Sequence, residues 1–168
     1  MRHTEKVRHN TTILVAASPK LVGEVLADLS THVAWNDVVA EAIPAATGSL
    51  SGQPAWITTL RANVGPFARS KKLRMARTEN QIGTDGVRRI TFERREVDGR
   101  DHADWTMRVE VSPDGDGTSV DLSLEYTGGL WVGALDPVLR AAIDRATAKL
   151  PTYLETRAAS GNGADQSP

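Results

Sequence analysis

The sequence contains no cysteine, and this absence excludes disulfide bonds, thiolate metal sites and a cysteine nucleophile. It also contains no run of the roughly 18 apolar residues that a membrane-spanning helix needs. The polar start, residues 1–6, is not followed by the apolar segment of a secretory signal. Together these absences predict a cytoplasmic protein with no integral membrane contact.

A strong excess of charge of either sign is missing as well. The formal net charge is −1, with 40% hydrophobic and 24% charged residues, which is typical of a globular chain and offers no long-range attraction to nucleic acid. We therefore predict no nucleic-acid partner. The 168 residues suffice for one domain, predicted over residues 1–157. Residues 158–168 have no apolar pattern and are predicted to form a disordered tail.

Motifs for common catalytic and cofactor sites are also absent. The chain has no Gly-x-Ser-x-Gly nucleophile turn, no phosphate loop and no Gly-x-Gly-x-x-Gly fingerprint. His3, His9, His32 and His102 do not have the spacing of metal ligands, so we expect structural or surface roles for them. The sequence predicts neither a metal nor a cofactor, and it leaves the catalytic residues, if any, undefined.

Most of the chain shows the alternation of apolar and polar residues that indicates β-strands. It is clearest where Trp105, Met107 and Val109 alternate with Thr106 and Arg108. Such alternation predicts a sheet with one covered and one wet face. Glycine- and proline-rich turns separate the predicted strands, which span residues 5–15, 38–45, 55–64, 69–77, 87–97, 102–112 and 118–127.

Two segments have helical spacing instead. After the first strand, Ser18-Pro19 is a favourable helix start, and Ser30 is predicted to cap a second short helix. After Gly128-Gly129 the pattern becomes helical again, with a predicted start at Asp136-Pro137. Pro151 is expected to kink or end this long helix near Leu150.

The predicted fold is therefore α+β: a seven-stranded antiparallel sheet whose apolar face is covered by a long C-terminal helix, with two short helices after the first strand.

Two segments also resemble a known superfamily. They are residues 18–36, with Ser18-Pro19, His32 and Trp35-Asn36, and residues 125–154, from the final strand into the long helix. Both are similar to SRPBCC proteins, the START-like (Bet v 1-like) helix-grip group, in its polyketide cyclase/dehydrase-type branch. The resemblance implies a curved sheet wrapped around the C-terminal helix and a ligand cavity between them.

On this fold, our first hypothesis is that a small hydrophobic molecule (a lipid, an isoprenoid or an aromatic polyketide) binds in the internal cavity. An inward Arg94 would need a partner such as Glu41 or Glu96, or an anionic ligand group. Trp35 is predicted to be a core residue that docks the short helix. The candidate ligand-binding residues are Trp56, Leu60, Met75, Phe92, Arg94, Trp105, Met107, Leu124 and Tyr126.

Two further hypotheses stay open on sequence grounds. The chain could be a polyketide cyclase/aromatase or a dehydratase that acts in the same cavity, with Tyr126, Arg94 and His32 as the nominated residues. Alternatively, the basic strands 69–95 could form a protein–protein interaction module, since residues 61–100 contain eleven Lys/Arg against five Asp/Glu. The ligand's identity and the oligomeric state are not predicted.

Overall fold

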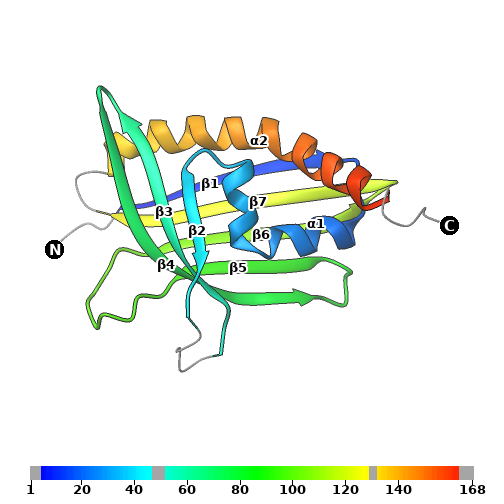
Figure 1. The fold of residues 1–168 in the computed structure, drawn as a ribbon, viewed down its shortest axis with the longest axis horizontal. Helices are drawn as coiled ribbons and strands as arrows, with labels where there is room; N and C mark the ends of the chain where they lie inside the picture. The colour runs from blue at the N-terminus through cyan, green and yellow to red at the C-terminus, as the bar shows by residue number, and fades with distance from the viewer. Residues whose placement is uncertain (1–4, 47–51, 129–131, 163–168) are drawn as a thin grey trace.

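A computed structural model describes residues 5–46, 52–128 and 132–162. Seven strands form one antiparallel sheet in the order β1-β7-β6-β5-β4-β3-β2 (Figure 1). This arrangement confirms the predicted α+β class and the number of strands. The strands are β1 Glu5–Val15, β2 Val39–Pro44, β3 Ala55–Val64, β4 Phe67–Ile82, β5 Arg88–Arg94, β6 Trp105–Asp114 and β7 Gly117–Gly128.

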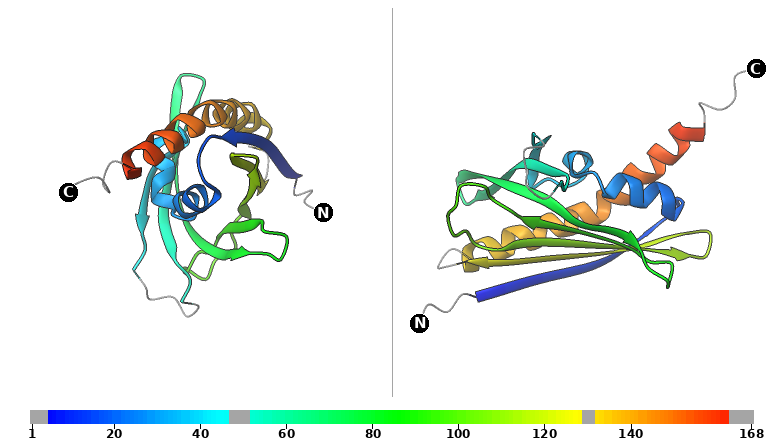
Figure 2. Two further views of the ribbon diagram at one scale, coloured as in Figure 1. Left: turned by 90° about the vertical axis from the view of Figure 1, so that its right-hand side faces the viewer. Right: turned by 90° about the horizontal axis from the view of Figure 1, so that it is seen from below.

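The sheet curves around the long helix α2, Val132–Asn162. Figure 2 shows the curved sheet end-on, with α2 lying across its concave face. Helix α1, Pro19–Leu26, and the short 3-10 helix η1, Leu29–Ala34, lie beside α2 on that face. The helix-grip prediction is therefore confirmed. Among the described residues, no helix is both long and apolar enough to cross a membrane.

Side-chain caps fix the two short helices. The Ser18 hydroxyl accepts a hydrogen bond from the backbone N–H of Leu21 at 3.3 Å, as expected for the start of α1. Helix η1 is capped by Asp28, whose carboxylate accepts from the backbone N–H of Ser30 at 3.0 Å. The prediction that Ser30 is the cap was wrong, because the acidic side chain two residues earlier occupies that role.

The ends of strands β4, β5 and β6 differ from the sequence prediction. Strand β4 continues to Ile82, because it pairs with β5 as far as Arg88 across a register shift between Arg77 and Glu79. The last pair between β5 and β6 joins Glu93 and Thr106. Residues 95–97 and 102–104 lie beyond this regular pairing and are not strand, although both segments were predicted to be.

Helix α2 is longer than predicted at both ends. It begins before Asp136, so the predicted start was wrong. It also continues past Pro151, so the helix does not end near Leu150, which was one of the two outcomes predicted for this proline. Leu150 and Leu154 are both fully buried, one turn apart, and their packing holds the helix on the sheet across the proline. Residues 158–162 of the predicted tail are therefore helical, while residues 163–168 lie outside the described part.

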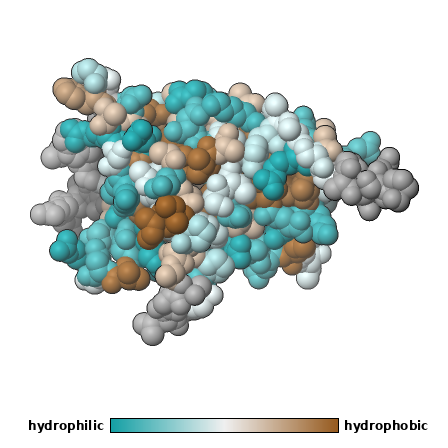
Figure 3. Space-filling view, viewed as in Figure 1, coloured by the Kyte–Doolittle hydropathy of each residue, from teal (hydrophilic) through white to brown (hydrophobic). Residues whose placement is uncertain are grey.

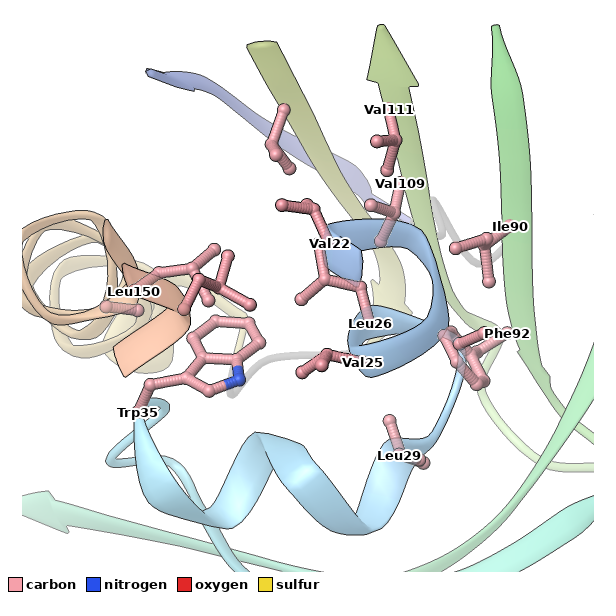
Figure 4. Packing of buried hydrophobic residues seen from close by; sticks show 14 of the residues in the cluster. Val22, Val25, Leu26, Leu29, Trp35, Ile90, Phe92, Val109, Val111 and Leu150 are labelled. Atoms are coloured by element: carbon pink, nitrogen blue, oxygen red, sulfur yellow. The ribbon is translucent and has the colours of Figure 1, made fainter. Parts of the chain in front are cut away.

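The main core fills the space between the sheet and the three helices (Figure 4). Strands β5 to β7 contribute fully buried aliphatic residues such as Ile90, Val109 and Val120. Helix α1 packs Val22 and Leu26 against them. Farther from α1, toward the N-terminal half of α2, apolar side chains no longer fill all the space between the helix and the sheet.

His32 is the one histidine that is fully buried among the described residues. Its Nε2 lies 3.1 Å from the carbonyl oxygen of Leu26, and its ring packs against Trp35 and Phe92. Burial lowers the pKa of His32 from 6.5 to about 4, because the apolar surroundings disfavour the charged ring. The ring is therefore neutral at physiological pH.

We predict that Leu154→Ala lowers the free energy of unfolding by about 2–5 kcal/mol, because it leaves a void where α2 packs beyond Pro151. Urea denaturation measures this loss. The exposed Thr152→Ala variant of the same helix is the control, with an expected change within about 0.5 kcal/mol. Equal, small effects in both variants would contradict packing of α2 beyond Pro151.

We also predict that His32 makes the protein less stable as the pH falls from 6.5 to 4. Over this range the unfolded chain binds a proton at His32 that the folded chain does not bind, and the difference corresponds to about 3 kcal/mol. The His32→Gln variant should lose this part of the pH dependence. Urea denaturation of both proteins at several pH values measures it, and parallel curves would refute the assignment.

Candidate functional site

A cavity of about 80 Å³ lies between the concave face of the sheet, η1 and α2. Its walls are mainly apolar: Leu139, Ala142 and Ala146 of α2 face residues of β3, β4, β6 and β7. None of the described residues that line it is Lys, Arg, Asp or Glu. The space therefore suits an uncharged, largely apolar molecule.

Five of the nine candidate ligand-binding residues line this cavity. They share the concave face because each has the inward parity of its strand. Met75 is buried, whereas the others are only partly buried and retain room to move. The five are Leu60, Met75, Trp105, Met107 and Leu124.

Trp56 and Phe92 belong to the solid part of the core instead. Their rings contact each other edge to face, with centroids 5.8 Å apart, and Phe92 is fully buried. Neither side chain lines the cavity. The alternation along their strands predicted correctly that both side chains lie on the concave face of the sheet. It could not distinguish the filled core from the cavity wall, because both lie on that face.

Arg94 points to a second, polar hollow of about 310 Å³ at the end of strands β5 to β7. Its Nε lies 2.7 Å from Oε1 of Glu96, one of the two predicted partners, and its terminal nitrogens contact Ala103 and His102. The side chain is only 7% exposed. Its charge is therefore already matched within the protein, and it does not reach the apolar cavity.

Tyr126 lines the polar hollow and not the apolar cavity. Its ring stacks on Trp105, with centroids 5.2 Å apart, and its hydroxyl is 3.5 Å from Oδ1 of Asp136. Burial and the neighbouring carboxylate raise the pKa of Tyr126 to about 12. The tyrosine therefore stays protonated and can act as a hydrogen-bond donor.

His9 was not among the candidates, yet it lines the cavity. Its Nε2 is 2.9 Å from Oδ1 of Asp136, a distance that suits an ion pair, although the two atoms are not aligned as a hydrogen bond. Its ring also stacks beside Tyr126, with centroids 6.2 Å apart. The alternation of β1 contained the signal, since His9 has the same parity as the buried Ile13 and Val15.

Three further residues line the cavity, and each has one polar atom without a hydrogen-bond partner. These atoms are Nδ1 of His32, Nε1 of Trp35 and Oγ1 of Thr58, and all three residues are at least nine-tenths buried. Trp35 thus lies in the core, as predicted, and borders the cavity as well. Thr58 was not among the candidate ligand-binding residues, although it has the same inward parity on its strand as Trp56 and Leu60.

The basic strands carry less unmatched charge than their composition suggests. Arg89 pairs with Asp85 and Glu110, Arg95 pairs with Glu93, and Arg77 donates to the carbonyl of Ala27. On the face drawn in Figure 3, hydrophobic side chains form small separate groups among polar ones. These contacts do not favour a docking surface on strands 69–95.

No group of three His, Cys, Asp or Glu side chains that could hold a metal ion occurs in the part of the chain that the structure describes. The polar groups next to the cavity are single neutral donors and acceptors, together with the His9–Asp136 pair. This set can orient a ligand or move a proton.

Several solved structures share this fold. The di-domain ARO/CYC StfQ from the steffimycin biosynthetic pathway aligns with a TM-score of 0.63 at 13% identity over 92% of this chain and 52% of its own. A STAR-related lipid transfer protein from Xanthomonas axonopodis aligns with a TM-score of 0.61 at 16% identity, over 88% of this chain and 85% of its own. The protein TTHA0849 from Thermus thermophilus aligns with a TM-score of 0.60 at 19% identity, over 94% of this chain and 99% of its own.

At these identities the structural similarities establish the fold alone. No curated protein sequence matches the chain significantly. The sequence profile of one family does match, over residues 6–155, and so covers the sheet and most of α2. The chain therefore belongs to the family described as polyketide cyclase / dehydrase and lipid transport.

Proposed function

We propose that this protein binds a small hydrophobic molecule in the cavity between the sheet and α2. The observation that carries the proposal is the apolar, charge-free wall of that cavity. Each 100 Å² of apolar ligand surface removed from water contributes about 2.5 kcal/mol to binding. Membership of a family that includes lipid transport supports the same function.

The cavity must widen to admit a ligand of ordinary size. Its volume of about 80 Å³ is below the roughly 300–1,000 Å³ of typical ligand pockets. The side chains of Leu60, Trp105, Met107 and Leu124 are only partly buried, so they can turn aside at modest cost. Methionine in particular adapts to irregular shapes, because its side chain is long and unbranched.

A second candidate function is catalysis on the bound molecule, in line with cyclase/aromatase or dehydratase chemistry. The His9–Asp136 pair supports it, since the cavity-lining imidazole lies 2.9 Å from a carboxylate that can orient it. The Tyr126 hydroxyl donates a hydrogen bond to the same carboxylate at 3.5 Å and so helps to hold it beside His9. This cluster, rather than Arg94, is where proton transfer to a ligand would occur.

For the binding function, we predict that Ala146→Leu lowers ligand occupancy at least about tenfold, because the added side chain fills space on the cavity wall. Native mass spectrometry of freshly purified protein, followed by organic extraction, measures the occupancy. The matched control Ala148→Leu changes the exposed face of the same helix and should leave the ligand occupancy unaltered. Nile red fluorescence provides a second measurement with a defined probe.

A clean apo mass, together with no Nile red binding by the wild type, would contradict the binding function. Equal binding by the wild type and Ala146→Leu would place the ligand elsewhere. Melting curves of both variants confirm that each remains folded.

For the catalytic function, we predict that His9→Gln abolishes proton exchange between the bound ligand and deuterated water but changes ligand affinity less than about threefold. The reason is that glutamine keeps a polar group on β1 yet cannot serve as a base. Proton NMR of the ligand extracted from the protein measures the exchange. Exchange that is absent in the wild type, or unchanged in the variant, would exclude this role for His9.

A further inference from the structure

We propose that the ligand of this cavity carries a neutral hydroxyl group, which docks against His32, Trp35 and Thr58. The inference rests on the proposed binding function and adds the chemical class of the ligand. Its basis is that these three residues line a mainly apolar cavity and that each has one buried polar atom without a hydrogen-bond partner. The fourth such atom, Nε2 of His9, differs because it lies 2.9 Å from Oδ1 of Asp136. Buried polar atoms in folded proteins are nearly always paired, so three orphans around one space indicate a missing partner.

The donor and acceptor roles of these atoms follow from their contacts. Nε2 of His32 lies 3.1 Å from the carbonyl oxygen of Leu26, which can only accept, so Nε2 carries the proton. In the neutral ring, Nδ1 is then an acceptor with a free lone pair. The indole nitrogen of Trp35 can only donate, and the hydroxyl of Thr58 can do either.

All three residues line the same cavity. The rings of His32 and Trp35 are adjacent, with centroids 4.7 Å apart, and both come from the η1 segment. Thr58 lies on β3, on the sheet wall of the same cavity.

A hydroxyl fits this set better than other polar groups. It can donate to Nδ1 of His32 and accept from Nε1 of Trp35, whereas a ketone would leave His32 without a donor. A carboxylate would place a negative charge in a cavity whose described lining contains no Lys or Arg, and it would repel the His32 lone pair. The expected ligand class is therefore an alcohol, phenol or enol on an apolar frame.

The test compares two probes of nearly equal shape, naphthol and methylnaphthalene, by isothermal titration calorimetry. The wild type should bind naphthol at least about tenfold more tightly, since hydrogen-bonding sites reject analogues that leave buried polar groups unpaired. Trp35→Phe and Thr58→Val should each reduce this preference about threefold or more, with little change in the affinity for methylnaphthalene.

A matched control distinguishes an orphan hydroxyl from a satisfied one. Thr118 is also buried, but its hydroxyl donates to the carbonyl of Ala17 at 2.6 Å, away from the cavity. Thr118→Val should lower the urea midpoint and leave the probe preference unchanged. Thr58→Val should instead raise the urea midpoint of the ligand-free protein, because it removes an unpaired buried polar atom.

Each outcome decides between the proposals. Equal affinity for both probes would overturn the hydroxyl site while leaving hydrophobic binding intact. A lower urea midpoint in Thr58→Val would indicate that a permanently bound water already satisfies the hydroxyl, and it would also overturn the site. If neither probe binds, the hydroxyl site and the proposed binding function both fail.

Discussion

The structure depends on covering the concave apolar face of a strongly curved sheet. Seven antiparallel strands direct alternate side chains to that face, and those side chains must be removed from water. One straight helix cannot fill a curved surface of this width, so α1 and η1 fill one end and α2 spans the whole length. The space that remains between α2 and the strands is the cavity.

The division between core and cavity follows from where the short helices lie. Around α1 the side chains are fully buried, and no room is left for a ligand; they include Val22, Ile90, Phe92 and Val109. Toward the first half of α2 the wall residues Trp105, Met107 and Leu124 are only partly buried. Small residues on α2, such as Ala142 and Ala146, keep the helix from filling this end. The cavity thus lies at the less well packed end of one continuous core.

The polar groups of the molecule are separated in the same way. On the outer face, Arg89 pairs with Asp85 and with Glu110 of the neighbouring strand β6, and Arg95 pairs with Glu93, so part of the basic surface is matched within the protein. Inside, the unmatched atoms of His32, Trp35 and Thr58 border the cavity. Each of these atoms forgoes a hydrogen bond in the structure, which is an unfavourable feature of the kind that functional sites commonly retain.

The sequence by itself determined the α+β class, the seven strands and the inward faces of most of them, because alternation with a period of two is a local property of the chain. The same alternation identified Met75, Trp105 and Met107 as inward-facing. Local signals were insufficient where packing overrode them: buried Leu154 keeps α2 helical beyond Pro151, although the proline alone predicted a kink or an end near Leu150.

Only the tertiary structure decided which inward residues line a cavity and which fill the core. Trp56 and Phe92 have the same parity signal as Trp105, but their distance from α1, η1 and α2 depends on how the sheet curves. The structure also brought His9 of β1 next to Asp136 of α2, and gathered His32, Trp35 and Thr58 around one space. Such contacts join residues far apart in the chain, and no local pattern encodes the distance between them.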